Sequence, residues 1–284
     1  MKKVLIVGAN SYIGESFAKY AGNRFSIDTV ETVNNDWKTK SFSKYDCILH
    51  VAGIAHRTQA PELKQLYFSV NRDLAISVAQ KAKAEGVKQF IFISSFSVYG
   101  KNTGRIRNID KPSPQKNDYY GQSKYQAEQN INLLQSDDFN VALVRPPMVY
   151  GPGCKGNFHK LVNYTKKLSF FPNIDNQRSM IFIDNLSEFF SILIEKGCSG
   201  IFMPQDEEYV RTSSMVQEIA ISLGKKLYIT KIFNPFICFL MPYMPILQKC
   251  FGSLYYDEST KVGLLQDGWQ VSSFNNSITK SILP

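Results

Sequence analysis

The chain has 284 residues, of which 44% are hydrophobic and 20% are charged, and its formal net charge is +9. This length is enough for one large core or for a main domain with a smaller one, and the apolar content excludes a disordered chain. The positive charge suits an anionic partner such as a nucleotide, a nucleic acid or a membrane surface, or it reflects a generally basic surface. The sequence contains no block of five or more like charges, so nucleic acid is the disfavoured partner.

The cysteines and the hydrophobic segments indicate whether the protein is disulfide-bonded, zinc-binding, secreted or membrane-spanning. No CxxC pair and no His/Cys spacing typical of zinc is present, so we expect neither a disulfide framework nor a metal site from Cys47, Cys154, Cys198, Cys238 and Cys250. The N-terminus, MKKVLIVGAN, reaches glycine and polar residues too early for a secretory signal. The most apolar stretch, 233–247, is short and carries three prolines, so it should not cross a bilayer as one helix. Packing over a small domain is favoured for it over docking on a membrane or a partner, and we expect a cytoplasmic protein.

Strands and helices alternate along the first half of the chain. Residues 3–7, KVLIV, form a continuous apolar run ending at Gly8, which is typical of a strand buried on both faces. We expect further strands at 25–31, 46–53, 88–94 and 140–146, and helices at 12–21, 71–86 and 119–134. This alternation predicts an α/β fold with a Rossmann-type, doubly wound parallel sheet.

The regular alternation of strands and helices ends after Gly151. GPGCKGN reads as a loop, 180–183 as a short strand, and 184–197 as a helix that Asp184 caps. We interpret residues 1–150 as the main, Rossmann-type domain. Residues 151–284 should form mainly a smaller substrate-binding lobe, with some segments returning to the sheet.

The turn VGANSYIG, after the first strand, predicts a phosphate-binding site. Glycines there permit a tight turn and close backbone approach to a pyrophosphate at the helix N-terminus. Gly8 and Gly14 occupy the outer positions, whereas Ser11 stands where a middle glycine is usual. The residues that we expect to contact the cofactor here are Gly8, Asn10, Ser11, Tyr12, Ile13 and Gly14.

Glu31 follows the second strand, 23 residues after Gly8. A carboxylate at that place accepts hydrogen bonds from the adenosine ribose and repels a 2′-phosphate. No arginine follows in TVNNDWK to bind such a phosphate, so NAD is favoured over NADP. The alternative is that Glu31 is an ordinary solvated strand end.

DYYGQSK, residues 118–124, places Tyr120 four residues before Lys124. On a helix these two side chains share a face, although such a pair arises by chance about once in a chain of this composition. Ser95, in FISSFSVYG, supplies support because it ends a predicted buried strand, where a doubly wound sheet places its ligand crevice. Tyr119 is expected to pack or to line the cleft.

Together these segments resemble the extended short-chain dehydrogenase/reductase family, in particular NAD-dependent epimerases and dehydratases of the UDP-glucose 4-epimerase type. The resemblance covers nearly the whole chain and is carried by GANSYIG, HVAGIAH, VNRDLAISVAQKAKAEGVKQFIFISS, SVYG, YGQSK, RPPMVYGPG and RSMIFIDNL. It implies that Tyr120 is the catalytic base, that Ser95 binds the same substrate oxygen, and that Lys124 holds the nicotinamide ribose. Ala52 and Gly53 join the cofactor contacts.

A free tyrosine has a pKa of about 10, which is too high for a base at neutral pH. We expect the Lys124 ammonium and the positive nicotinamide ring to lower the pKa of Tyr120.

Two positions narrow the chemistry that the resemblance implies. Dehydratases of the family carry an Asp-Glu pair where this chain has Phe96 and Ser97, so 4,6-dehydration is disfavoured, and Ser97 is instead expected to contact substrate. No cysteine follows Ser95, unlike in the 3,5-epimerising GDP-fucose synthases. Oxidation and reduction at one carbinol, most naturally C4, remain.

On the substrate side, the resemblance implies that Arg178 and Asn157 bind the diphosphate, with a surface role as the alternative for each. Met148 departs from the family pattern, since most relatives carry a substrate-contacting asparagine there. Asn71 and Arg145 are expected to be structural.

The three histidines, His50, His56 and His159, are expected to be non-catalytic. The stretch between the second and third strands is also short, which should leave the adenine pocket more open than in relatives.

The leading hypothesis is an NAD-dependent UDP-sugar 4-epimerase, and the runner-up is a nucleotide-linked 4-keto-sugar reductase with the same residues. A catalytically idle dinucleotide-binding regulator is the third. Family association implies a role in polysaccharide synthesis and allows a homodimer.

Overall fold

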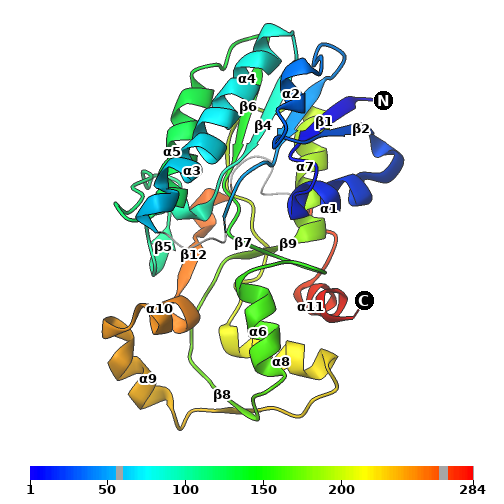
Figure 1. Cartoon of the computed structure of the whole chain (residues 1–284). Coiled ribbons are helices and arrows are strands. Elements are labelled where there is room, and N and C mark those ends of the chain that lie inside the picture. Colours follow the sequence, from blue (N-terminus) through cyan, green and yellow to red (C-terminus); the bar gives the residue numbers. More distant parts are fainter. Residues whose placement is uncertain (56–59, 262–267, 284) are drawn as a thin grey trace. The chain divides into compact units, whose positions relative to one another are not determined.

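The structure is a computed structural model, and it describes residues 1–55, 60–261 and 268–283. The chain divides into two compact units, which are described separately (Figure 1). Unit 1 comprises Met1–Gly100, Lys111–Pro146 and Leu186–Pro204, and unit 2 comprises Lys101–Asp110, Pro147–Asn185 and Gln205–Pro284.

Unit 1 is built on a six-stranded sheet in the order β10-β6-β4-β3-β1-β2, with every neighbouring pair parallel. Its strands are β1 (Lys3–Val7), β2 (Ser26–Val30), β3 (Cys47–His50), β4 (Gln89–Ile93), β6 (Asn140–Val144) and β10 (Gly200–Phe202). β3 and β4 are buried along their whole length, as continuous apolar runs in a covered parallel sheet should be. The predicted Rossmann-type, doubly wound fold is therefore confirmed.

Helices cover both faces of this sheet. In Figure 1, α4 and α5 lie on one face, and α1 and the unit 1 part of α7 lie on the other. The α1 and α7 helices meet through the rings of Phe17 and Phe190, 5.9 Å apart and edge to face. The helices are α1 (Tyr12–Ala21), α2 (Asp36–Thr39), α3 (Lys64–Phe68), α4 (Leu74–Ala84), α5 (Tyr119–Asn132) and α7 (Ile183–Lys196), with 3₁₀ turns at Gly22–Arg24, Pro61–Leu63 and Phe96–Tyr99.

The helix predicted at 71–86 begins earlier than its sequence pattern indicates. The structure has α3 first, then a π-helical segment, Ser69–Asp73, and then α4. Asn71 lies within the π-helical segment, and its buried side chain bonds to the backbone of Ile54. The wider turn thus coincides with an inward-facing polar side chain, which the hydrophobic pattern does not reveal.

The connection between β2 and β3 is short, as the sequence indicated. It contains one helix of four residues, α2, whose Trp37 is buried. β3 then returns to pair directly with β1.

Unit 2 contains three separate two-stranded parallel pairs, β5–β12, β7–β9 and β8–β11. The strands are β5 (Gly104–Ile106), β7 (Met148–Tyr150), β8 (Phe170–Pro172), β9 (Met180–Phe182), β11 (Tyr228–Thr230) and β12 (Leu254–Tyr256). The helices are α6 (Asn157–Thr165), α8 (Thr212–Ser222), α9 (Asn234–Leu240), α10 (Pro245–Phe251) and α11 (Phe274–Ile282), with 3₁₀ turns at Met241–Tyr243 and Glu258–Thr260.

One helix start differs from its prediction. α7 begins at Ile183, directly after β9, so Asp184 lies inside the first turn and does not cap the helix. Its carboxylate lies 3.5 Å from the ammonium of Lys280 in α11.

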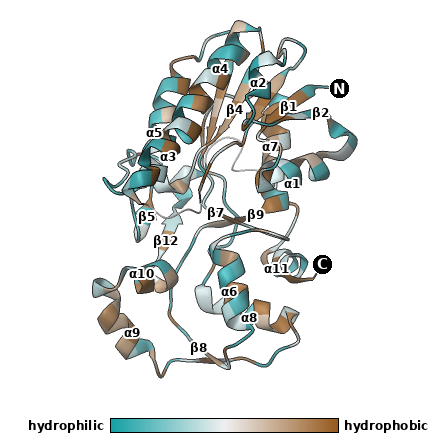
Figure 2. Cartoon of the chain, viewed as in Figure 1, coloured by the Kyte–Doolittle hydropathy of each residue, from teal (hydrophilic) through white to brown (hydrophobic). Residues whose placement is uncertain are grey.

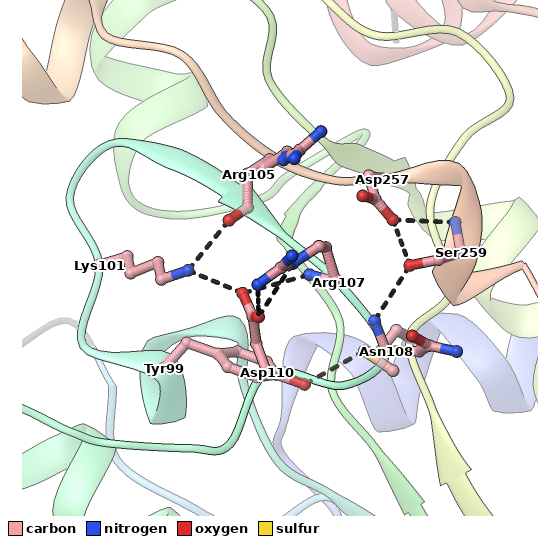
Figure 3. A network of polar contacts seen from close by, with 9 residues as sticks. Tyr99, Lys101, Arg105, Arg107, Asn108, Asp110, Asp257 and Ser259 are labelled. Atoms are coloured by element: carbon pink, nitrogen blue, oxygen red, sulfur yellow. Dashed lines mark hydrogen bonds and ion pairs between the residues drawn. The ribbon is translucent and has the colours of Figure 1, made fainter.

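A polar network within unit 2 ties residues 101–110 to the segment after β12 (Figure 3). The Lys101 ammonium donates to Asp110 (2.8 Å), and the Arg107 guanidinium donates to the same carboxylate (3.1 Å). The backbone N–H of Asn108 donates to the Ser259 hydroxyl (3.2 Å). The Lys101 hydrogen bond lowers the pKa of Asp110 to about 2, so this carboxylate is ionised at neutral pH and holds the loop in place.

The apolar segment 233–247 forms α9, a 3₁₀ turn and most of α10. Ile237 is its one buried side chain. The expectation that this segment packs over the smaller lobe is therefore wrong. Across the described parts of the chain, every helix is too short or too polar to cross a bilayer.

Candidate active site

The predicted cofactor residues lie at one edge of the sheet in unit 1. Because β1, β2, β3 and β4 are parallel neighbours, their carboxyl ends meet at that edge. Gly8 follows β1, Glu31 follows β2, Gly53 lies just beyond β3, and Ser95 lies just beyond β4. From β1 the chain adds β2 on one side and then crosses back to add β3 on the other side. Doubly wound sheets bind their ligands at the point where the strand order reverses in this way.

The turn after β1 depends on Gly8. Its φ is +113°, a conformation that side chains disfavour, and a Cβ built there would lie 2.6 Å from the backbone N of Ala52. The Gly8 N–H donates to the carbonyl of Val30 (3.0 Å). The turn therefore lies directly against the segment after β3, which brings two groups of predicted cofactor residues together.

Ser11 caps α1, with its hydroxyl accepting a hydrogen bond from the backbone N–H of Gly14 (3.1 Å). Tyr12 and Ile13 are the first two residues of that helix. The serine that replaces the usual middle glycine thus stabilises the helix N-terminus that would face a phosphate.

Asn10 and Glu31 form a pair across the ends of β1 and β2, with the Asn10 amide donating to the Glu31 carboxylate. This contact holds the carboxylate beside the phosphate turn, which is where a ribose-binding acid is needed.

The start of α5 is set by two close contacts. The Asp118 carboxylate caps the helix by accepting from the backbone N–H of Gly121 (3.0 Å). A Cβ on Gly121 would lie 2.8 Å from the carbonyl oxygen of Ser97, so only glycine lets the helix come this close to the turn after β4. This approach brings Tyr120 within hydrogen-bonding reach of Ser95.

The pKa of Tyr120 is raised above its ordinary value of 10.0, and burial is the largest cause. The hydrogen bond with the Ser95 hydroxyl acts in the opposite direction, and the nearby Asp118 carboxylate raises the pKa further. Lys124 does not contribute. The lowering of the Tyr120 pKa expected from Lys124 is therefore not found in this structure, because burial also disfavours the Lys124 ammonium. Desolvation of the phenolate then outweighs the stabilisation that Ser95 provides.

Lys124 is buried, with 4% of its surface exposed. Its Nζ donates to the carbonyl of Ile93 (2.8 Å) and lies 4.7 Å from the centre of the Phe92 ring. Burial lowers the pKa of Lys124 to about 7, although the Glu128 carboxylate raises it. The side chain is therefore divided between amine and ammonium near neutral pH.

Asn71 connects the segment after β3 to α5. Its Oδ1 accepts from the N–H of Ile54 (2.9 Å), and its Nδ2 donates to the Ile54 carbonyl (3.0 Å) and to the Ser123 hydroxyl (3.2 Å). Ser123 in turn donates to the carbonyl of Tyr120 (2.9 Å). Asn71 therefore provides the structural support that the sequence predicted, and it is linked to the backbone of Tyr120 through Ser123.

Three further residues surround the candidate site and were not predicted from the sequence. Phe92 and Ile93 contact Lys124, and the ring of Tyr67 lies 6.5 Å from the ring of Tyr120 at an interplanar angle of 64°. Of these three residues, only Tyr67 could have been found from the sequence, because it precedes Asn71 by four residues and so shares its helix face.

The described histidines have no catalytic environment. His50 is fully buried between the rings of Phe90 and Phe92, each 5.9 Å away. Burial and the nearby Lys124 lower the pKa of His50 to about 3, so the ring is neutral. His159 is exposed on α6, and His56 lies outside the described residues.

Arg145 forms a buried ion pair with Glu128, with Nη2 2.6 Å from Oε2, and donates through Nη1 to the Tyr99 hydroxyl (2.9 Å). The structural function predicted for this strand-end arginine matches these contacts.

The predicted diphosphate residues belong to unit 2 and are described there alone. Asn157 is the exposed first residue of α6, which begins where the sequence predicted. Arg178 is partly buried, and its Nη1 donates to the carbonyl of Gly252 (2.8 Å). Burial lowers its pKa, and no ion pair of Arg178 occurs among the described residues. Met148 is the partly buried first residue of β7.

The residues at the sheet edge fit a dinucleotide. The Gly8 turn admits close backbone approach, the α1 N-terminus follows it, and a carboxylate stands at the end of β2. By contrast, the described ranges contain no group of three or more His, Cys, Asp or Glu side chains that could hold a metal ion.

Comparisons with known proteins agree with this geometry. Residues 4–202 match the model of the NAD dependent epimerase/dehydratase family. The UDP-glucose 4-epimerase of Vibrio cholerae is 36% identical over 189 residues, which is 63% of this chain and 57% of that protein. The N-acetyl-alpha-D-glucosaminyl-diphospho-ditrans,octacis-undecaprenol 4-epimerase of Escherichia coli O157:H7 is 24% identical over 79% of this chain and 73% of that protein.

Among solved structures, the UDP-glucuronic acid 4-epimerase of Bacillus cereus in complex with NAD superposes with a TM-score of 0.73 at 17% identity. That match covers 99% of this chain and 97% of the other, and it shows a shared fold. In sequence, the chain matches little more than half the length of the Vibrio cholerae relative.

Proposed function

Because the chain belongs to the NAD dependent epimerase/dehydratase family, we propose that it is a UDP-sugar 4-epimerase that acts by transient oxidation at C4. The observation that carries the proposal is the close approach of the start of α5 to the turn after β4, which brings Tyr120 near enough to the Ser95 hydroxyl for it to lower the tyrosine's pKa, with Lys124 one helical turn further along α5. The 36% identity to a UDP-glucose 4-epimerase supports the reaction type.

In this proposal Tyr120 and Ser95 act on the sugar O4. Tyr120 Oη, in its phenolate form, takes the O4 proton when C4 is oxidised and returns it when C4 is reduced, so no proton is lost over the cycle. The positive nicotinamide ring of bound NAD would favour the phenolate against the burial that raises the pKa of Tyr120. The Ser95 hydroxyl donates to the same oxygen and holds it in place. Bound NAD supplies the acceptor for the C4 hydride and its return. Lys124 lies beside Gly53, with its Nζ 3.2 Å from a Cβ built there, and we assign it to the nicotinamide ribose.

Arg178 and Asn157 are proposed to hold the diphosphate. Support comes from the Arg178 guanidinium, which is partly buried and donates to a backbone carbonyl rather than to a carboxylate. A buried cation without an acidic partner is unfavourable by itself and is stabilised by an anionic ligand. Asn157 adds an amide at the exposed N-terminus of α6.

The test uses the purified protein with UDP-glucose or UDP-N-acetylglucosamine and no added reductant. We expect a C4-inverted product with the native chain and with Tyr119→Phe, and at least a hundredfold slower turnover with Tyr120→Phe, since general acid–base catalysis contributes about 10²–10⁴-fold. Conversion of a 4-keto sugar only with stoichiometric NADH or NADPH would instead identify the 4-keto-sugar reductase. Unchanged turnover of Tyr120→Phe would refute the assignment of Tyr120.

Release of the nucleotide from denatured protein tests the cofactor. We expect NAD, because the Glu31 carboxylate would repel the 2′-phosphate of NADP. Recovery of NADP alone would contradict this assignment.

The exposed apolar segment around α9 suits a second candidate carrier of the sugar, a polyprenyl diphosphate in place of UDP. The Escherichia coli relative is named for a sugar joined to undecaprenol through a diphosphate, and Arg178 would meet the same diphosphate chemistry. Offering N-acetylglucosamine on UDP and on a polyprenyl diphosphate in parallel separates the two carriers. If only the lipid-linked sugar is inverted, the carrier is the polyprenyl diphosphate and not UDP, and the proposed reaction at C4 is unchanged.

A further inference from the structure

Exposed apolar side chains are concentrated in one short segment of unit 2, residues 232–246. Seven of the eighteen exposed large hydrophobic residues of the described chain lie within these fifteen positions. Their exposed fractions range from 39% to 81%, and they are Ile232, Phe233, Phe236, Phe239, Tyr243, Met244 and Ile246. Single exposed apolar residues are normal, whereas a contiguous group marks a surface that binds something.

The segment presents these side chains from consecutive short elements. α9 has seven residues, a 3₁₀ turn follows at Met241–Tyr243, and α10 has seven more. Figure 2 colours most of α9 towards the hydrophobic end of the scale. Ile237 is the one buried side chain of α9, and Asn234 donates to the carbonyl of Asn173 (2.8 Å), while Phe236 and Phe239 are 68% and 71% exposed.

The length of these elements excludes a bilayer span and allows a position at its surface. Seven-residue helices broken by prolines are far shorter than the ~20 residues that a spanning helix needs. Short apolar elements rich in phenylalanine and tyrosine can instead lie in the interface, with their rings at the level of the headgroups.

The charged residues around this segment in the sequence are all basic. Between Glu218 and Asp257 the sequence has no acidic residue and four lysines, Lys225, Lys226, Lys231 and Lys249. Lys226, Lys231 and Lys249 are exposed.

One acidic residue close to this segment in unit 2, Asp175, is neutralised by a neighbouring arginine. Asp175 lines a hollow of about 490 Å³ together with Lys231, Asn234, Cys238 and Arg211. The Asp175 carboxylate pairs with Arg211 at 2.6 Å. Asp175 and Arg211 also line a second hollow with Glu207, Glu208 and Glu258. The exposed apolar side chains of the segment are combined with neighbouring lysines that form no ion pair among the described residues.

We infer that residues 232–246 form a docking surface for an anionic lipid bilayer, on which the protein binds as a peripheral membrane protein. Apolar burial and attraction of lysines to anionic headgroups add in such binding. A second copy of this chain fits less well, because a symmetric contact would bring the lysines of both copies together, and the stretch from 219 to 256 has no acidic side chain to pair with them. The inference does not depend on the reaction that the protein catalyses.

The test is flotation of the full chain with vesicles. Two vesicle types are compared at the same lipid concentration, phosphatidylcholine alone and phosphatidylcholine mixed with phosphatidylglycerol. The double variant Phe236→Ser/Phe239→Ser removes two exposed rings of the docking surface. The matched control, Leu133→Ser/Ile221→Ser, removes two apolar side chains that are 80% and 60% exposed elsewhere.

We expect the native chain and the control to float with the phosphatidylglycerol vesicles, more strongly than with phosphatidylcholine alone and less at high salt. The Phe236→Ser/Phe239→Ser variant should bind at least tenfold more weakly. Circular dichroism checks that each variant is folded. Absence of flotation of the native chain, equal binding by all variants, or equal loss in the control would overturn the inference. It would also be overturned by dimerisation in the absence of vesicles that Phe236→Ser/Phe239→Ser abolishes, since that result assigns the surface to a second copy.

Discussion

Replacing Lys124 with methionine should stabilise the protein against unfolding at acidic and neutral pH while abolishing its activity. The lysine is buried, and its pKa falls from 10.5 to about 7 because burial disfavours the ammonium. Methionine has a similar length and carries no charge, so the variant removes the desolvated cation and retains much of the packing.

The magnitude follows from the two pKa values. A fall from 10.5 to about 7 corresponds to about 5 kcal/mol against the charged form, and this penalty is fully present below pH 7. The unfolded chain keeps its proton up to pH 10.5, so the native protein gains stability relative to the variant as the pH rises from 7 towards 10.5. Between about pH 6 and pH 9 the expected gain is about 2–3 kcal/mol.

The assay is chemical denaturation of the native chain and of Lys124→Met at both pH values. The comparison across pH is informative because the lost hydrogen bond to Ile93 affects both measurements equally. Lys88→Met is the control, since the Lys88 side chain is 69% exposed and its cation stays in water. The reasoning is refuted if the difference between native and Lys124→Met protein does not change with pH, or changes in the opposite direction.

Three further substitutions test other contacts. Gly8→Ala should lower the free energy of unfolding by about 1–3 kcal/mol and reduce the cofactor recovered from purified protein, because its φ of +113° disfavours a side chain; native-like values for both would contradict this. Glu31→Gln should raise the affinity for NADP relative to NAD about tenfold in titrations, since it removes a charge worth about 1.4 kcal/mol of repulsion; an unchanged ratio counts against the assigned ribose contact. Glu128→Gln should lower stability by about 3–5 kcal/mol because it leaves the buried Arg145 guanidinium uncompensated, and a loss below about 1 kcal/mol would show that the pair is not needed.

Much of the candidate site could be read from local patterns. The predicted helix at 12–21 agrees with α1, because its Ser11 cap and amphipathic face are local features. The step from Tyr120 to Lys124 predicts a shared helix face for the same reason. The contacts assigned to Asn157 and Arg178 stay predictions, since they require a ligand that connects distant parts of the chain.

The sequence by itself determined the order of strands and helices, the phosphate turn and the pair of Tyr120 and Lys124, because each depends on residues close together in the chain. The tertiary structure decided what surrounds them. The pKa of Lys124 depends on burial beneath β4, and the inward turn of Asn71 depends on the backbone of Ile54. Likewise, which side chains of residues 232–246 are exposed depends on which other segments reach them. Burial is set by segments far apart in sequence, and no local pattern records it.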